Sequence, residues 1–319
     1  MSDQSLRLGI SACLLGQPVR YNGGHKFSSI CNQVLGPAVE FVSFCPEQAA
    51  GLGTPRPAMH LRGEARQPDL VLVKGGTDLS AQLQAGYRDL LDSFDNLDGF
   101  VLMQKSPSCG LFRVRLYDQE GRQKREHSTG LFAKALQQRF PLLPLEEEGR
   151  LHNPQLFDNF MLRVQARHHF RHQVLAQPSQ RALTQFHARY KYLLMAHSPQ
   201  LTRNMGRFLA TAHDLPLQQR CHHYQHQLMQ CLGKHANRKG HSNALQHMLG
   251  YLRSTVSSDA RQLIAKSIEQ FRHGHQPLHV PLGLLHHYAA QLEQDYLSQQ
   301  QYFAPYPACL YPANRTEHL

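Results

Sequence analysis

Short apolar runs alternate with longer segments of helical pattern in the first half of the chain. The runs have the length of strands and lie at residues 6–12 (LRLGISA), 39–45 (VEFVSFC), 69–75 (DLVLVKG) and 99–105 (GFVLMQK). Residues 78–94 and 128–140 have the pattern of helices, and Pro141 ends the second helix. Strands that alternate with helices indicate an α/β domain with a mainly parallel sheet.

A different pattern begins near residue 155, where strand-like runs fade and helical periods take over. These periods are clearest at residues 153–176, 179–197 and 258–273. Ser198 followed by Pro199 is a typical helix start, and Ser257 or Ser258 can cap a later helix. The second half of the chain therefore reads as all-helical.

The charge of the two halves supports the same division. The net charge is +11, but residues 1–150 hold 17 Lys and Arg against 16 Asp and Glu, which leaves +1. Residues 151–319 hold 17 against 7, which leaves +10, and also 19 of the 22 histidines. Such basicity favours a polyanionic partner, although a merely solvated basic surface is the alternative. We expect an α/β domain at residues 1–154 followed by an all-α domain at residues 155–319.

The sequence also restricts the compartment. No stretch approaches the roughly 20 apolar residues of a membrane span, and the first ten residues lack the features of a secretion signal. The seven cysteines are an odd number without the dense spacing of a disulfide scaffold. We therefore expect reduced thiols in a cytoplasmic protein.

Three of the cysteines follow strand-like runs. Cys13 comes after the first run, Cys45 ends the second, and Cys109 comes shortly after the fourth. The carboxyl ends of parallel strands meet at one edge of a sheet, so we expect the three thiols to converge there. Glycine or proline lies close to each cysteine, which lets the backbone approach a bound group.

Several kinds of site fit three converging thiols. Structural zinc usually takes local Cys-x-x-Cys pairs, which this sequence lacks. Three thiolates from distant loops suit a 4Fe-4S cluster in which the protein leaves one iron unligated. A single catalytic thiolate and small cysteines that only fill a core are the alternatives that the spacing leaves open.

Longer motifs add a family resemblance. The segments SACLLGQPVRYNGGHK, CPEQAAGLGTPRP and KSPSCG closely resemble the thiouracil desulfurase (TudS) family over roughly residues 6–150. The segments FHARYKYLLMAHSP, LQHMLGYLRS and PLHVPLGLLHHY resemble the YbgA-like domain. This fusion is similar to the RudS-type desulfidases, which remove sulfur from 4-thiouridine in tRNA.

The resemblance implies a cofactor and a reaction. The family's motif cysteines carry a 4Fe-4S cluster and correspond to Cys13, Cys45 and Cys109, whereas no role carries over to the other four cysteines. The resemblance further implies that the substrate's sulfur binds the open iron and that water attacks the carbon. A carbonyl then remains, with no net redox change.

Two residues are candidates for the catalytic groups of this reaction. Glu47, two residues after Cys45, can take the proton of the attacking water. Its alternative role is to cap the helix that follows. Ser106, near Cys109, can hydrogen-bond the nucleobase or the cluster, although a turn-forming serine would look the same.

Further substrate contacts are expected beside the first and third cysteines. The candidates are Ser11, Arg20, Tyr21, His25, Lys26, Lys105 and Ser108. The loop after Cys13 combines cations, an aromatic ring and a Gly-Gly pair, which suits a stacked base or a phosphate. Taken singly, each of these residues can also be an ordinary solvated loop residue.

Basic residues of the helical half are candidates for tRNA contacts. They are Arg189, Lys191, Arg203, Arg207, Lys234, Arg238 and Lys239. Residues 189–192 interleave charges with tyrosine rings, as readers of single-stranded RNA do. A target base in folded tRNA has to be exposed or extruded, and backbone contacts can offset that cost of about a few kcal/mol.

Other functions stay open at this point. The substrate can instead be free thiouracil or a thionucleoside, or the protein can be a non-catalytic RNA binder with structural cysteines, or a redox protein. A zinc site at HHYQH (222–226) is a further alternative, but the sequence offers no matching second pair of ligands. Surface histidines that add positive charge at low pH are the simpler interpretation.

Overall fold

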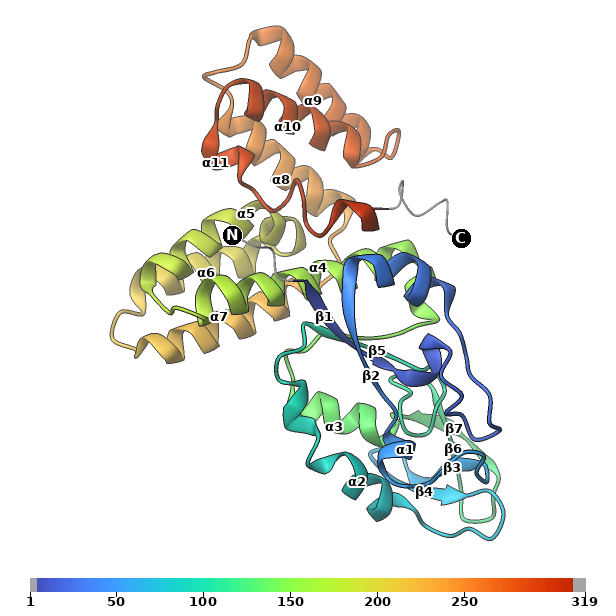
Figure 1. Cartoon of the computed structure of the whole chain (residues 1–319). Helices are drawn as coiled ribbons and strands as arrows, with labels where there is room; N and C mark the ends of the chain where they lie inside the picture. Colours follow the sequence, from blue (N-terminus) through green and yellow to red (C-terminus); the bar gives the residue numbers. More distant parts are fainter. Residues whose placement is uncertain (1–4, 312–319) are drawn as a thin grey trace. The chain divides into compact units, whose positions relative to one another are not determined.

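The computed structural model describes residues 5–311, which form two compact units (Figure 1). The first unit extends to Val164 and includes the segment from Pro307, and the second comprises Gln165–Tyr306. The chain passes from one unit to the other within helix α4 (Pro154–Phe170). The division of the chain after residue 154 stays a prediction.

A parallel four-stranded sheet forms the centre of the first unit. Its strands, in spatial order, are β2 (Val39–Phe44), β1 (Leu6–Ser11), β5 (Gly99–Leu102) and β8 (Leu145–Glu147). Strand β1 pairs with β2 up to Ser11↔Phe44 and with β5 up to Ile10↔Val101. The carboxyl ends of these three strands therefore lie side by side. This arrangement confirms the predicted α/β domain.

The packing of β1 against β5 depends on a glycine. Leu8 and Ile10 of β1 are fully buried, as expected for a strand of a covered parallel sheet. A Cβ atom on Gly9 would lie 2.2 Å from the ring of Phe100, which is itself fully buried. The absence of a side chain at position 9 thus leaves room for that ring.

The apolar runs do not predict the second sheet of this unit. Its strands, in spatial order, are β4 (Gln67–Leu72), β3 (Met59–Glu64), β6 (Val114–Tyr117) and β7 (Gln123–Ser128). The central strands β3 and β6 run parallel, and the outer strands are antiparallel to their neighbours. The prediction that the run at 69–75 belongs to the parallel sheet is therefore wrong, because this run forms β4.

Helices α2 (Ser80–Arg88) and α3 (Leu131–Arg139) and the turn η4 (Leu91–Phe94) share a hydrophobic core with residues of both sheets. The unit also contains α1 (Pro46–Ala49), η1 (Ala12–Leu15), η2 (Ile30–Leu35), η3 (Gly36–Ala38), η5 (Arg150–His152) and η7 (Ala308–Leu310). The rings of Phe94, Phe100 and Phe132 contact one another edge to face in this core. The predicted helix at 78–94 is divided into α2 and η4.

The second unit is helical across the residues that the structure describes, which confirms the predicted all-α region. After α4 and the turn η6 (Arg171–Leu175) come α5 (Gln180–His197), α6 (Pro199–Thr211), α7 (Leu217–Leu232), α8 (Arg238–Tyr251), α9 (Ser258–Arg272), α10 (His279–Gln291) and α11 (Asp295–Ser298). Helix α5 packs against α6, α7 and α8, and α8 packs against α9 (Figure 1). Ser198 caps α6, and Ser257 caps α9, as the sequence predicts.

Histidine–tyrosine pairs tie the helices of this unit together. Nδ1 of His187 on α5 lies 3.0 Å from the hydroxyl of Tyr224 on α7, and Nδ1 of His241 on α8 lies 2.6 Å from the hydroxyl of Tyr302. Both tyrosines are buried, so their hydroxyls need an internal partner. Part of the histidine content is therefore structural. No helix within residues 5–311 has the length and apolar character needed to cross a membrane.

Candidate functional site

Three cysteines meet at the carboxyl edge of the parallel sheet. Cys13 lies in η1 directly after β1, Cys45 follows the last residue of β2, and Cys109 lies in the segment after β5. Cys109 is close enough to Cys13 and Cys45 for each of them to raise its pKa. The predicted convergence of distant strand ends is thus present in the structure.

The three thiols are poor free nucleophiles in these surroundings. Burial, with a smaller effect of Glu47, raises the pKa of Cys13 to about 11 and that of Cys45 to about 12. Burial also raises the pKa of Cys109 well above its ordinary value. A thiol that stays protonated at neutral pH is a poor nucleophile, so this setting disfavours a single free catalytic thiolate.

Glu47 lies at the centre of this group. It stands in the first turn of α1 and is buried, and its Oε2 accepts a hydrogen bond from the Cys45 thiol at 3.1 Å. It is also the largest charge effect on the pKa of Cys13, Cys45 and Cys109 after burial. The carboxylate predicted as a base is therefore placed among the cysteines.

Arg56 is a site residue that the sequence analysis overlooks. Its Nη2 lies 3.9 Å from Glu47 Oε2, and its Nη1 donates to the carbonyls of Val19 (3.0 Å) and Gly53 (2.9 Å). Its backbone N–H donates to the carbonyl of Tyr21. One buried guanidinium thus connects the loop after Cys13 with Glu47. In the sequence, only its place within the motif CPEQAAGLGTPRP could have indicated that Arg56 belongs to the site.

The segment that carries Cys109 is anchored to helix α3. The carbonyl of Ser108 accepts hydrogen bonds from the N–H groups of Phe132 and Ala133, at 2.9 and 3.2 Å. A Cβ atom on Gly130 would lie 2.5 Å from that carbonyl, so the approach requires glycine. The Ser106 hydroxyl accepts from the backbone N–H groups of Ser108 and Cys109, at 3.2 and 3.1 Å. Ser106 therefore shapes the turn around Cys109.

Two acidic residues outside the predicted set of site residues hold the segment that carries Cys109. Glu147, the last residue of β8, accepts hydrogen bonds from the N–H groups of Leu111 (2.8 Å) and Phe112 (3.2 Å). Glu148 accepts one from the N–H of Gln104 at 2.8 Å. Both carboxylates are buried. They fix the Cys109 segment on either side of the cysteine. In the sequence, the run EEE has the appearance of a polar segment that leads out of the domain.

Two serines offer hydroxyl groups to a guest at the cysteines. The Ser11 hydroxyl lies within hydrogen-bonding reach of Cys109 and lowers its pKa, and it also accepts from the N–H of Met103. Ser108 is completely buried, and its hydroxyl has no hydrogen-bond partner. A buried polar group without a partner needs an explanation, and a bound group that accepts its proton supplies one.

This donor set fits an iron–sulfur cluster. Cysteine thiolates are the usual ligands of such clusters, and each cysteine binds a different iron. Within residues 5–311, no three His, Cys, Asp or Glu side chains are grouped around the position of a single ion. Three thiols from different strand ends, together with the Ser11 hydroxyl beside Cys109, are the kind of donor set that a cluster takes.

The other predicted substrate contacts surround the cysteines less closely. Arg20 is near enough to Cys13 to lower its pKa, and its guanidinium lies 5.8 Å from the centre of the Tyr21 ring. The side chains of Tyr21, His25 and Lys26 are exposed. Lys105 is also exposed and has a left-handed backbone, with φ of 59°. Of this set, the structure thus brings the Arg20 side chain close to Cys13, and the backbone N–H of Lys26 donates to the carbonyl of Cys13 at 2.9 Å.

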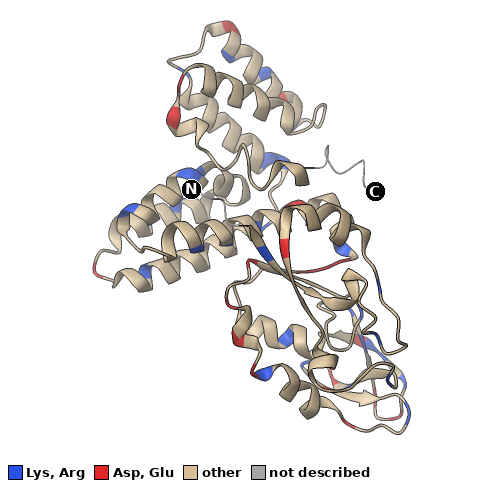
Figure 2. Ribbon diagram, in the orientation of Figure 1, with Lys and Arg blue, Asp and Glu red and all other residues tan. Residues whose placement is uncertain are grey.

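The predicted tRNA contacts on the helical unit differ in exposure. Arg203, Arg207, Lys234, Arg238 and Lys239 are exposed, and Arg189 and Lys191 are half-buried. In Figure 2 the basic residues are spread along the helices of this unit, and acidic residues are few.

The interpretation of residues 189–192 as a base-stacking run is wrong. Tyr190 and Tyr192 are 1% and 4% exposed, and the ring of Tyr190 stacks on that of Phe186 at 4.3 Å inside the unit. Around residues 222–226, as in the rest of residues 5–311, no three His, Cys, Asp or Glu side chains are grouped around the position of a single ion.

Comparisons with known proteins agree with this division of the chain. Residues 8–148 match the family model described as 2-thiouracil desulfurase. Residues 191–307 match the family model described as protein of unknown function (DUF1722). Uncharacterized protein YbgA of Escherichia coli (strain K12) is 37% identical over 127 residues, which cover 40% of this chain and 75% of that protein.

Two further similarities are to a second uncharacterized protein and to a solved structure. Uncharacterized protein YbbK of Bacillus subtilis (strain 168) is 29% identical over 108 residues, which are 32% of this chain and 71% of that protein. The solved structure of 4Fe-4S-dependent thiouracil desulfidase TudS is 32% identical, covers 46% of this chain and 94% of its own, and has a TM-score of 0.39. The chain belongs to the family of YbgA, and it contains one region that matches the 2-thiouracil desulfurase model and one that matches DUF1722.

Proposed function

We propose that this protein removes sulfur from 4-thiouridine in tRNA and leaves uridine, in an iron–sulfur-dependent reaction without net redox change. The observation that carries the proposal is the meeting of Cys13, Cys45 and Cys109 around the buried carboxylate of Glu47. The match of residues 8–148 to the 2-thiouracil desulfurase model supports sulfur removal from a thiopyrimidine.

The three cysteines would hold a 4Fe-4S cluster. When bound, the cluster supplies an iron without a protein ligand, which binds and polarises the sulfur of a thiocarbonyl group. The Ser11 hydroxyl lies within hydrogen-bonding reach of Cys109, and the buried Ser108 hydroxyl next to it in sequence has no partner, so both are candidates to donate to bound sulfur. The overall conversion is thiocarbonyl plus water to carbonyl plus hydrogen sulfide, so atoms balance without an oxidant or reductant.

Glu47 is the base of this reaction in our proposal. Once Cys45 is a deprotonated ligand, its thiol no longer donates to Oε2, and the carboxylate can accept the proton of a water molecule instead. The guanidinium of Arg56 lies 3.9 Å from the same oxygen and holds the carboxylate in place. The chain thus provides a fixed acceptor beside the position where water attacks the carbon.

The choice of tRNA as substrate rests on charge and family resemblance. The second half of the chain carries a net charge of +10 at a formal count, which favours a polyanion. The candidates Arg203 and Arg207 stand one helical turn apart on α6 and are exposed together. The description of the family that matches the first unit favours free thiouracil as a second candidate substrate.

One experiment separates these substrates. The cluster is reconstituted anaerobically, and the protein is then incubated with tRNA that contains 4-thiouridine and, separately, with free thiouracil. We expect loss of 4-thiouridine, release of sulfide, and no consumption of added reductant. Sulfide release from free thiouracil alone would replace tRNA by the free base as the substrate.

A further inference from the structure

The second sheet of the first unit has one face in the core, and its other face is exposed along β6 and β7 but covered at Val71 of β4, the partner of His60. Leu61, Leu70, Val114 and Leu116 point into the core and are almost fully buried. Residues on the other face alternate with them along each strand, as in any sheet with one wet side.

Six residues define what we call the arginine–tyrosine face. They are His60 and Arg62 on β3, Arg115 and Tyr117 on β6, and Arg125 and His127 on β7. The strand register places them together, since Arg62 is the partner of Tyr117 and Arg115 is the partner of His127. Three strands therefore contribute to one continuous surface.

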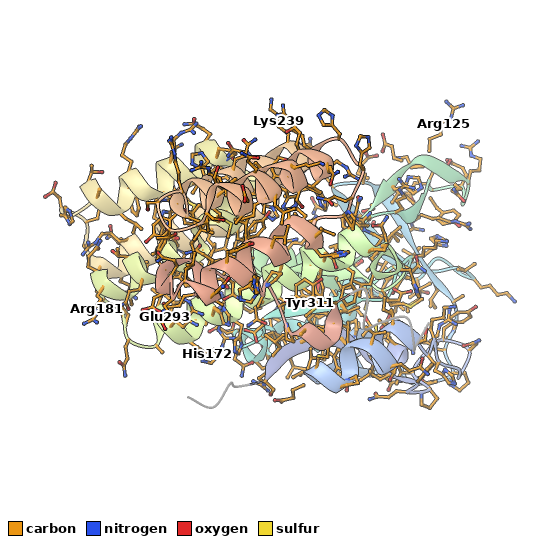
Figure 3. The ribbon with its side chains drawn as sticks, turned by 90° about the horizontal axis from the view of Figure 1, so that it is seen from above. Arg125, His172, Arg181, Lys239, Glu293 and Tyr311 are labelled. Carbon is orange, nitrogen blue, oxygen red and sulfur yellow. The ribbon has the colours of Figure 1, made fainter. Side chains whose placement is uncertain are left out.

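The charges of this face are available to an anion. Arg115 and Arg125 are exposed, and within residues 5–311 neither of them forms an ion pair. Figure 3 shows the side chain of Arg125 extending away from its strand into solvent. Basic residues also mark β6 and β7 in Figure 2.

Acidic side chains are also present near the face. Asp69 lies opposite Arg62 on the outer strand β4, and Glu64 is occupied by Lys124 at 3.3 Å. In the turn after β6, Asp118 and Glu120 both pair with Arg122. Strands β6 and β7 themselves carry one acidic residue, the exposed Glu126, against Arg115, Lys124 and Arg125, so their net formal charge is positive.

Aromatic rings occupy the two central strands. The rings of His60 on β3 and Tyr117 on β6 are 4.5 Å apart and tilted by 35°, and both are half-exposed. An open four-stranded sheet with rings on its central strands and cations around them is a surface on which unpaired bases stack and phosphates bind. A duplex would not fit such a face, because its bases are not accessible for stacking.

The direction of the strands connects this face with the cysteines. Strand β3 begins three residues after Arg56, whose guanidinium contacts Glu47. Strand β6 begins five residues after Cys109. Because β3 and β6 are parallel, the same end of both strands adjoins the cysteine site. A chain of nucleotides lying along them would lead into that site.

We propose that the arginine–tyrosine face binds unpaired nucleotides that flank the target base of an RNA substrate. This proposal rests on the proposed function, since it assumes that the base is presented as part of an RNA strand. It gives the desulfurase unit an RNA-binding surface of its own, independent of the basic helical unit. Tyr117 would stack on a flanking base, and Arg115 and Arg125 would each contact a phosphate.

RNA binding by the full chain tests the proposal directly. The probe is a short fluorescein-labelled oligouridine without sulfur, and its affinity is measured by fluorescence anisotropy at several salt concentrations. We expect Tyr117→Ala to weaken binding roughly tenfold, and Tyr117→Phe to bind like the wild type, because the ring supplies the stacking. The pair Arg115→Gln and Arg125→Gln should lower the salt slope by about 1.4, or about 0.7 for each phosphate contact on single-stranded RNA.

A matched control removes the same charge elsewhere on this unit. Arg139→Gln changes an exposed arginine of α3 and should leave affinity unchanged. The same variants should lower kcat/KM on thiolated tRNA about tenfold but spare turnover of free thiouracil. Wild-type affinity in both Tyr117→Ala and the double arginine variant would overturn the inference, whatever the activity. If the wild type binds the oligouridine through this face but takes no sulfur from tRNA, the inference stands and the proposed function fails.

Discussion

The guanidinium of Arg56 lies 3.9 Å from the carboxylate of Glu47, and their side chains are only 7% and 9% exposed. Two opposite charges are rarely buried without mutual compensation, because desolvation of an unpaired charge is costly. Arg56 is held in turn by the carbonyls of Val19 and Gly53. The position of the base is thus set by a network that begins in the loop after Cys13.

Replacing Arg56 should therefore damage catalysis without removing the cysteines. Arg56→Lys keeps the charge but cannot reach Val19, Gly53 and Glu47 together, since lysine lacks the planar fork. We expect kcat to fall about ten- to a hundredfold, as misplacement of a catalytic group by about 1 Å can do. The measurement is single-turnover sulfide release, with iron content determined on the same sample. Wild-type kcat in this variant would remove Arg56 from the positioning network.

Loss of Glu147 should loosen the Cys109 segment. Glu147→Ala leaves the N–H groups of Leu111 and Phe112 without their acceptor, and Leu111 is buried. We expect the free energy of unfolding to fall by roughly 2–3 kcal/mol, since an unsatisfied buried donor costs about 1–3 kcal/mol. Urea unfolding checks this value. Glu120→Ala, in the exposed turn between β6 and β7, is the control and should change stability by less than about 0.5 kcal/mol.

The helical unit should lose stability at mildly acidic pH. Burial lowers the pKa of His187 and of His241 from 6.5 to about 4, so both stay neutral in the folded protein at pH values where the unfolded chain binds a proton. The free energy of unfolding therefore falls as pH drops from 6.5 toward about 4, by about 1–2 kcal/mol per histidine near pH 5.

Urea unfolding of the wild type and of His241→Gln, at neutral and mildly acidic pH, measures this dependence. The variant should show a shallower loss of stability with falling pH, whereas the exposed His226→Gln should follow the wild type. An identical pH dependence in His241→Gln and the wild type would show that this histidine is not the group that titrates.

The exposed arginines of α6 should matter for tRNA alone. Replacing Arg203 and Arg207 by glutamine should raise KM for thiolated tRNA several-fold and reduce the salt dependence of binding, because up to two phosphate contacts are lost. Turnover of free thiouracil should not change. An equal effect on both substrates would mean that α6 supports folding or the active site and does not bind RNA.

The sequence was sufficient for the cysteine site because strand-end geometry brings distant residues together. Apolar runs located β1, β2 and β5, and parallel order then implied that Cys13, Cys45 and Cys109 share one edge. The second sheet could not be predicted in this way, since β7 has the sequence QKREHS and is exposed at most positions. A strand that buries little apolar surface leaves no apolar run.

Residues that act through long-range contacts were equally hard to predict. Arg56 and Glu147 reach their partners only after the chain has folded, so no local pattern distinguishes them from solvated charges. For Tyr190 and Tyr192 the error was the reverse, because a local pattern predicted a binding role that the fold does not allow. They alternate with cations in sequence, but both rings are buried in the helical unit.

The central claim is that Cys13, Cys45 and Cys109 form one site that removes sulfur. The most direct measurement is the 4-thiouridine content of tRNA after anaerobic incubation with reconstituted wild type and with Cys13→Ala, Cys45→Ala and Cys109→Ala, alongside bound iron. Cys31→Ala is the matched control, because Cys31 is a buried cysteine of the same unit outside the site. We expect 4-thiouridine to disappear with the wild type and Cys31→Ala, and to persist with the other three variants, which should bind less iron. Full turnover by any one of those three variants would contradict the account.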